Sequence, residues 1–128
     1  MSTESIFKEI EETLGIVPGF FRAIPAESLQ AEWTLFRKAT LETDSPLEPK
    51  VRELIGISAA AARLCFYCVN FHTALAKFHG ATDREIQDTL ALSRFGGSWS
   101  TFLNGLSYDH ETFIRELEEV GRHLASRR

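Results

Sequence analysis

The chain has 128 residues, of which 44% are hydrophobic and 25% are charged, and its formal net charge is −4. This composition is typical of a globular protein and excludes wholesale disorder, and the length favours one domain over residues 1–128. An acidic balance with scattered basic residues argues against nucleic-acid binding.

The N-terminal segment has no basic region followed by an apolar stretch, which is the pattern of a secretory signal. The longest stretch of low polarity, from Ile55 to Ala62, is much shorter than the ~20 apolar residues that a membrane span needs. We therefore expect a cytoplasmic protein that does not bind membranes.

Apolar residues recur at helical spacing from the start of the chain. They predict a first helix from Thr3 to about Leu14, with Gly15 as its stop. A turn is expected at Pro18-Gly19, and a second helix is expected after Pro25. The apolar stripe of this second helix consists of Leu29, Trp33, Phe36 and Leu41.

The third predicted helix begins at Ser45-Pro46-Leu47-Glu48, where Ser45 can cap and Pro46 suits the first helical position. It runs to about Ala62. The fourth predicted helix begins near Cys65 and ends at His79-Gly80, where glycine favours a left-handed stop.

A capping box at Thr82-Asp83-Arg84-Glu85 predicts a fifth helix that ends at Phe95-Gly96-Gly97. A shorter helix is expected from about Trp99 to Leu106. The last helix carries Phe113, Leu117, Val120 and Leu124. β-branched residues do not alternate over any useful length, so we predict an all-α bundle of six or seven helices.

Cys65, Cys68 and His72 are the residues whose spacing indicates chemistry. Residues three or four apart share one face of a helix, so both sulfurs and the imidazole should lie on one stripe. A disulfide between Cys65 and Cys68 would close a very short loop and stabilise the fold little. In a cytosolic chain this spacing is more often catalytic or metal-binding. A neighbouring imidazole can take a proton from a thiol or stabilise the thiolate, which is the nucleophile.

Glu53 is a further candidate if the chain reverses near Arg63. Glu53 precedes that point by ten residues and His72 follows it by nine, so an antiparallel helix pair would place them at similar heights. A carboxylate in that place can orient the imidazole or relay its proton. The hypothesis needs a chain reversal at Ala62-Arg63-Leu64, which contains neither Gly nor Pro.

These residues resemble a known signature. Their spacing resembles the pattern of the AhpD-like, carboxymuconolactone-decarboxylase-related superfamily. In this pattern a glutamate (Glu53) is followed after eleven residues by Cys65-x-x-Cys68, and after three more residues by His72. The likeness includes the stretch from Leu47 to Ile86, and we expect the redox core at about residues 46–95. The segment Leu14-Gly15-Ile16-Val17-Pro18-Gly19-Phe20-Phe21 is similar to the lead-in of peroxidase-related members.

The resemblance implies an AhpD-like helical fold, homo-oligomers that are often trimers or hexamers, and a peroxidase cycle without a cofactor. In that cycle Cys68 attacks a hydroperoxide and becomes a sulfenic acid, and Cys65 resolves it as a disulfide. His72 and Glu53 serve as a proton relay. An external dithiol reduces the disulfide, and the resemblance implies a lipoyl group on a partner protein for this role.

Alternatives remain open at this stage. Some members carry a second histidine just before the second cysteine, where this chain has Tyr67, so a relay that needs two histidines is disfavoured. The dithiol can instead serve a non-catalytic redox sensor or a disulfide-exchange protein. Zinc would take Cys65, Cys68 and His72, with Glu53 or His79 as a fourth ligand. Decarboxylation is disfavoured, because true decarboxylases of the superfamily generally lack the cysteine pair.

Overall fold

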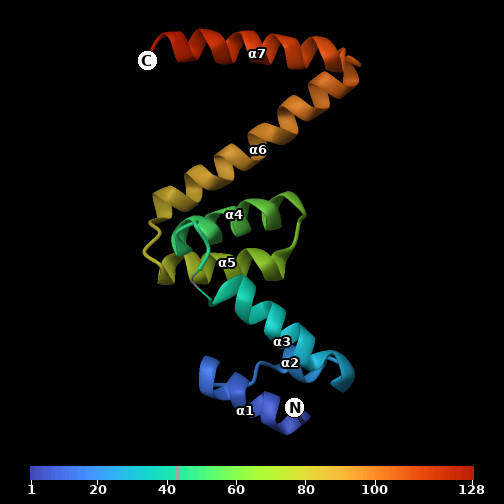
Figure 1. Cartoon of the computed structure of the whole chain (residues 1–128), viewed down its shortest axis with the longest axis vertical. Coiled ribbons are helices and arrows are strands. Elements are labelled where there is room, and N and C mark those ends of the chain that lie inside the picture. Colours follow the sequence, from blue (N-terminus) through green and yellow to red (C-terminus); the bar gives the residue numbers. More distant parts are fainter. Residues whose placement is uncertain (43) are drawn as a thin grey trace. The chain divides into compact units, whose positions relative to one another are not determined.

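The computed structural model describes residues 1–42 and 44–128, and within them every regular element is a helix (Figure 1). The helices are α1 (Thr3–Leu14), α2 (Gly19–Arg22), α3 (Ala26–Thr40), α4 (Pro49–Ala62), α5 (Phe66–Phe78), α6 (Asp83–Gly105) and α7 (His110–Ser126). The predicted all-α fold is confirmed. The described residues form two compact units, Met1–Pro46 and Leu47–Arg128. The single domain expected over residues 1–128 stays a prediction.

The first unit packs α1 against α3 around a small aromatic core. Its fully buried side chains are Ile6, Ile10, Phe21, Leu29 and Trp33. The Phe21 ring meets the Trp33 ring edge-on, with centroids 5.5 Å apart. The Trp33 indole N–H and the Arg37 guanidinium both donate to the same oxygen of Glu9, at 3.0 and 2.8 Å. This unit therefore has its own apolar core and its own polar anchor.

The second unit is built on a hairpin of α4 and α5, with the first half of α6 packed on α4 (Figure 1). Its core consists of Ile57, Ala76 and Ile86. Two polar contacts join α4 to α6: Lys50 donates to Glu85 at 3.0 Å, and the Ser93 hydroxyl donates to the Ser58 hydroxyl at 2.7 Å.

The third helix begins later than predicted. It starts at Pro49 with Glu48 as its N-cap, rather than at Pro46 with Ser45 as its cap. A helix from Pro46 would place Pro49 inside the first turn, where its ring disfavours helical geometry at the preceding residue. Glu48 accordingly has extended backbone angles, φ −58° and ψ 146°. The predicted end near Ala62 is confirmed.

The predicted helix end at Gly96-Gly97 is wrong, because α6 continues through both glycines to Gly105. Neither glycine has a positive φ, which a left-handed helix stop would require. The separate helix expected from Trp99 to Leu106 is therefore the second half of α6. Within the two described ranges, no helix combines the length and apolar character needed to cross a bilayer.

Candidate active site

The chain reverses direction between α4 and α5 at a residue with left-handed backbone angles. Arg63 caps α4, and Leu64 then adopts φ 57°, a conformation uncommon for any residue except glycine. The Cys65 N–H still donates to the Ala60 carbonyl at 3.0 Å, so the turn is closed by hydrogen bonds. The antiparallel helix pair that the Glu53 hypothesis requires is therefore present, although no Gly or Pro marks its turn.

Cys65 is the N-cap of α5 rather than a member of the helix. Its backbone is extended, with φ −92° and ψ 100°, and its sulfur accepts a hydrogen bond from the Cys68 N–H at 3.3 Å. An N-cap side chain normally offers an oxygen to this donor, and here a sulfur takes that place. Cys65 therefore meets the positive end of the helix dipole, which stabilises a thiolate.

The two thiols have unequal pKa values. The pKa of Cys65 is lowered, first because its sulfur accepts a hydrogen bond from the Cys68 thiol and second because the Cys68 N–H donates to it. The same thiol–thiol hydrogen bond raises the pKa of Cys68, and partial desolvation adds to that. Cys65 is half-buried and Cys68 is exposed. In the reduced pair the geometry thus favours a thiolate on Cys65 and a proton on Cys68.

Glu53 and His72 meet across the hairpin. One Glu53 carboxylate oxygen lies 2.7 Å from His72 Nδ1, and the Glu53 side chain is only 7% exposed. A buried carboxylate needs a polar partner, and the imidazole supplies it. With Nδ1–H donating to the carboxylate, Nε2 is the ring nitrogen left to exchange a proton. This contact joins the two residues as the sequence hypothesis required.

Gly56 is a site residue that the sequence reasoning missed. It lies one turn after Glu53 on α4, and the His72 ring packs against it. A Cβ added at Gly56 would lie 2.5–2.7 Å from three ring atoms of His72, which is closer than real side chains approach. The register of an antiparallel α4–α5 pair was the only signal that pointed to it. Gly56 leaves the room that lets His72 reach Glu53.

The predicted shared stripe is realised in part. Cys68 and His72 are four apart on α5 and Cys65 caps that helix, but among the described residues no hydrogen bond joins His72 to either thiol. Nor do the described residues contain a group of three or more His, Cys, Asp or Glu side chains placed to hold a metal ion. The zinc set of Cys65, Cys68 and His72 with Glu53 or His79 is therefore not assembled here.

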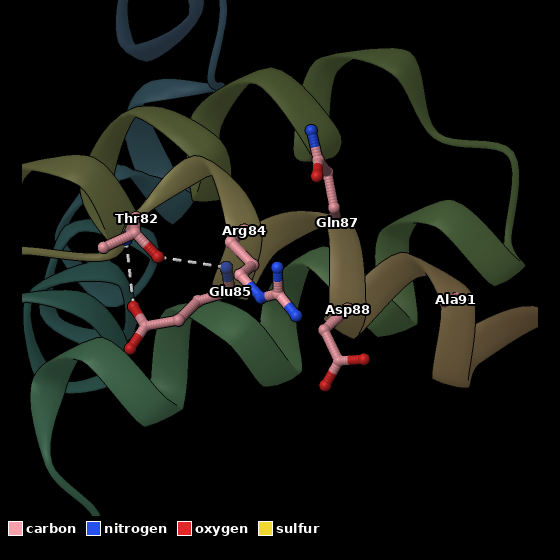
Figure 2. A pocket seen from close by; sticks show the side chains of 6 residues that line it. All are labelled: Thr82, Arg84, Glu85, Gln87, Asp88 and Ala91. Carbon is pink, nitrogen blue, oxygen red and sulfur yellow. Dashed lines mark hydrogen bonds between the residues drawn. The ribbon is translucent and has the colours of Figure 1, made fainter.

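A surface hollow of about 530 Å³ lies elsewhere, along the first turns of α6 (Figure 2). Its lining is Thr82, Arg84, Glu85, Gln87, Asp88 and Ala91. Figure 2 shows the reciprocal hydrogen bonds between Thr82 and Glu85 in the capping box. The Glu85 carboxylate also accepts a hydrogen bond from Lys50. The hollow contains neither a cysteine nor a histidine, so the dithiol and the Glu53–His72 pair remain the candidate site.

Comparison with known proteins agrees with this geometry. The model of the carboxymuconolactone decarboxylase family matches residues 27–111, which include Glu53, both cysteines and His72. The chain belongs to this family. Its fold is similar to the crystal structure of an alkylhydroperoxidase AhpD core from Rhodospirillum rubrum, with a TM-score of 0.72 and 24% identity over 87% of this chain and 85% of that one. Among curated proteins, none matches. The resemblance to AhpD-like proteins is thus confirmed at the level of family and fold.

Proposed function

We propose that this family member reduces hydroperoxides through a dithiol–disulfide cycle of Cys65 and Cys68. The observation that carries the proposal is the thiol pair at the N-terminus of α5, where the Cys68 N–H donates to the Cys65 sulfur and the pKa of Cys65 is lowered while that of Cys68 is raised. The buried Glu53–His72 contact supports it, because it supplies a proton relay within the same hairpin. The fold neighbour named as an alkylhydroperoxidase points to the same reaction class.

The cycle begins with Cys65 as the thiolate. The exposed Cys68 sulfur attacks the terminal oxygen of the hydroperoxide, its proton moves to Cys65, and the O–O bond breaks. The departing alkoxide receives that proton through His72 and leaves as an alcohol. Cys65, again a thiolate, attacks the Cys68 sulfenic acid; the S–S bond forms, the S–O bond breaks, and hydroxide leaves. The peroxide gains the two electrons that the dithiol loses.

A second dithiol must then reduce the disulfide by thiol exchange. We propose an external dithiol carrier of the lipoyl class for this step. Phe66 and Tyr67, which lie between the two cysteines in the chain and are 75% and 84% exposed, offer an apolar surface against which such a carrier can dock. The enzyme itself needs no cofactor in this scheme, and we propose that it works as a homo-oligomer in the cytoplasm.

The test is consumption of an organic hydroperoxide with dihydrolipoamide and its regenerating system. Wild type should turn over, and both Cys68→Ser and Cys65→Ser should lose turnover to the level of dihydrolipoamide alone. Trapping with dimedone should label a sulfenic acid at Cys68 in the Cys65→Ser variant. No turnover by folded, reduced wild type would contradict the proposal. A sulfenic acid found at Cys65 in Cys68→Ser, with none at Cys68 in the other variant, would reverse the roles of the two sulfurs.

A further inference from the structure

The turn that leads into the dithiol breaks a local folding rule at Leu64. The backbone there has φ 57°, a left-handed conformation that glycine adopts far more easily than leucine. The Leu64 side chain is 92% exposed, so the fold gains almost no apolar burial from it. Glycine would suit both the backbone and the exposure better. A leucine that costs the fold in both respects therefore points to a use outside the packing of the chain.

Leu64 belongs to a group of exposed apolar side chains beside the thiols. Phe66 and Tyr67 are 75% and 84% exposed, and their ring centroids lie 6.1 Å apart. Leu64 and Phe66 are the chain neighbours of Cys65, and Tyr67 directly precedes Cys68. A ligand with an apolar part would bury these side chains at the place where the dithiol reacts.

Arg63 adds one positive charge to this surface. Between Glu53 and Lys77 it is the only residue with a formal charge. Within the described ranges, its guanidinium has no hydrogen-bond or ion-pair partner, and its charge lowers the pKa of both thiols. Two residues separate it from Cys65, so the two Cα atoms are at most about 7 Å apart. A guanidinium binds carboxylates well, so the apolar turn offers one free site for an anion.

We propose that the substrate is a long-chain hydroperoxy acid, whose carboxylate pairs with Arg63 while its acyl chain lies on Leu64 and the neighbouring rings. An amphipathic anion of this kind matches both the single charge and the apolar surface. The inference rests on the proposed peroxidase function and names the class of its substrate. The hydroperoxy acid becomes a hydroxy acid and water, and the two thiols become a disulfide. The dithiol carrier uses the same surface after the hydroxy acid has left.

Kinetics with the hydroperoxide of linoleic acid and with its methyl ester, both below micelle-forming concentrations, test the role of Arg63. Wild type should have a KM about two- to fivefold lower for the acid, with a similar kcat, because an exposed ion pair acts equally before and at the transition state. Arg63→Gln should remove this difference, and Arg63→Lys should keep most of it. Any change in thiol pKa cancels in the ratio, because both substrates meet the same thiols.

A matched control removes the same charge elsewhere. Arg84 lies at the start of α6, at the end of the α4–α5 hairpin opposite to the turn (Figure 1). Arg84→Gln should leave the ratio of the two KM values unchanged. Leu64→Gly tests the apolar part: it should fold at least as stably as wild type, and it should raise KM for the methyl ester severalfold more than KM for tert-butyl hydroperoxide.

Linoleic acid itself provides a readout that needs no peroxidase turnover. It should slow the alkylation of the wild-type thiols by iodoacetamide more than methyl linoleate does, and Arg63→Gln should lose this difference. Turnover of both hydroperoxides with equal KM would overturn the substrate assignment and leave the peroxidase proposal standing. No turnover of either would contradict the peroxidase proposal, and equal protection by acid and ester would then overturn the ligand assignment as well. A change of mass in gel filtration for Arg63→Gln, with the KM ratio unchanged, would assign the turn to a contact between copies instead.

Discussion

The α4–α5 hairpin and the arm formed by the second half of α6 with α7 both carry apolar stripes, but within the described residues only the hairpin buries its stripe. Ile57 and Ala76 of the hairpin are fully buried, whereas Leu117 and Val120 of the arm are half exposed. Helices of this kind gain most of their stability from packing an apolar face. The hairpin therefore holds the candidate site by packing within the chain, whereas the apolar stripe of the arm is not covered by the described residues.

The largest effect is expected from His72→Ala, which removes the partner of a buried carboxylate. Removing the hydrogen-bond partner of a buried carboxylate costs about 3–5 kcal/mol, because the remaining charge stays desolvated. We expect the free energy of unfolding to fall by that amount in urea denaturation. Adding Glu53→Gln to the variant should recover part of the loss. Equal loss in the double variant would mean that Glu53 and His72 are not coupled.

A matched pair of truncations tests the comparison directly. Ile57→Ala should cost about 2–5 kcal/mol of unfolding free energy, because it opens a cavity in a packed core. Leu117→Ala should change it by no more than about 0.5 kcal/mol at nanomolar protein concentration. Its effect should grow with concentration, because self-association stabilises only the folded chain. A large, concentration-independent effect of Leu117→Ala would show that α7 packs within its own chain.

Glycines in the two regions should respond in opposite directions to alanine. Alanine favours a helix interior by about 0.5–1 kcal/mol, but crowding in a packed site costs about 1–3 kcal/mol. Gly56→Ala should therefore lower stability by about 1 kcal/mol and displace His72. Gly97→Ala, with open space around the added Cβ, should raise stability by up to about 1 kcal/mol.

The activity of the same two variants tests whether Gly56 positions His72. Peroxidase turnover should fall in Gly56→Ala and stay unchanged in Gly97→Ala. The His72 ring signals in NMR should shift in Gly56→Ala alone. Unshifted His72 signals in a folded Gly56→Ala protein would remove Gly56 from its positioning role.

Local signals predicted most of this architecture. The helix class, the stripe of α7 and the capping box at Thr82 follow from spacing and cap chemistry. The start of α4 was predicted three residues early because two prolines compete, and only the later one fits the first helical position. The continuity of α6 was missed because Gly96-Gly97 resembles a stop, while glycine stops a helix only where a left-handed turn follows.

The candidate site was less predictable than the fold. The Glu53–His72 contact followed from register once a hairpin was assumed. Two features required coordinates: the left-handed Leu64, which has no sequence mark, and the place of Cys65 as a cap rather than a helical residue. The sequence placed the start of the helix near Cys65, but it did not show that the Cys65 sulfur accepts from the Cys68 N–H, a contact that lowers the pKa of Cys65.

The smallest expected effect concerns the order of the pKa values of Cys65 and Cys68. Because its pKa is lowered, Cys65 should hold more thiolate than Cys68 at any pH near neutrality, and iodoacetamide should alkylate it severalfold faster. Fragment-ion mass spectrometry can assign the site, since both cysteines lie on one tryptic peptide. The preference should shrink as pH rises and Cys68 also ionises.

The Cys65→Ser variant tests whether the hydrogen bond to Cys65 is what raises the pKa of Cys68. Serine keeps a cap but carries no negative charge, so the hydrogen bond that holds the proton on Cys68 is weakened. Cys68 should then be alkylated at a lower pH than in wild type. Faster alkylation of Cys68 in wild type, or an unchanged pH profile for Cys68 in the variant, would mean that the α5 cap does not order the two thiols. The hairpin would then contribute only the Glu53–His72 pair to the chemistry.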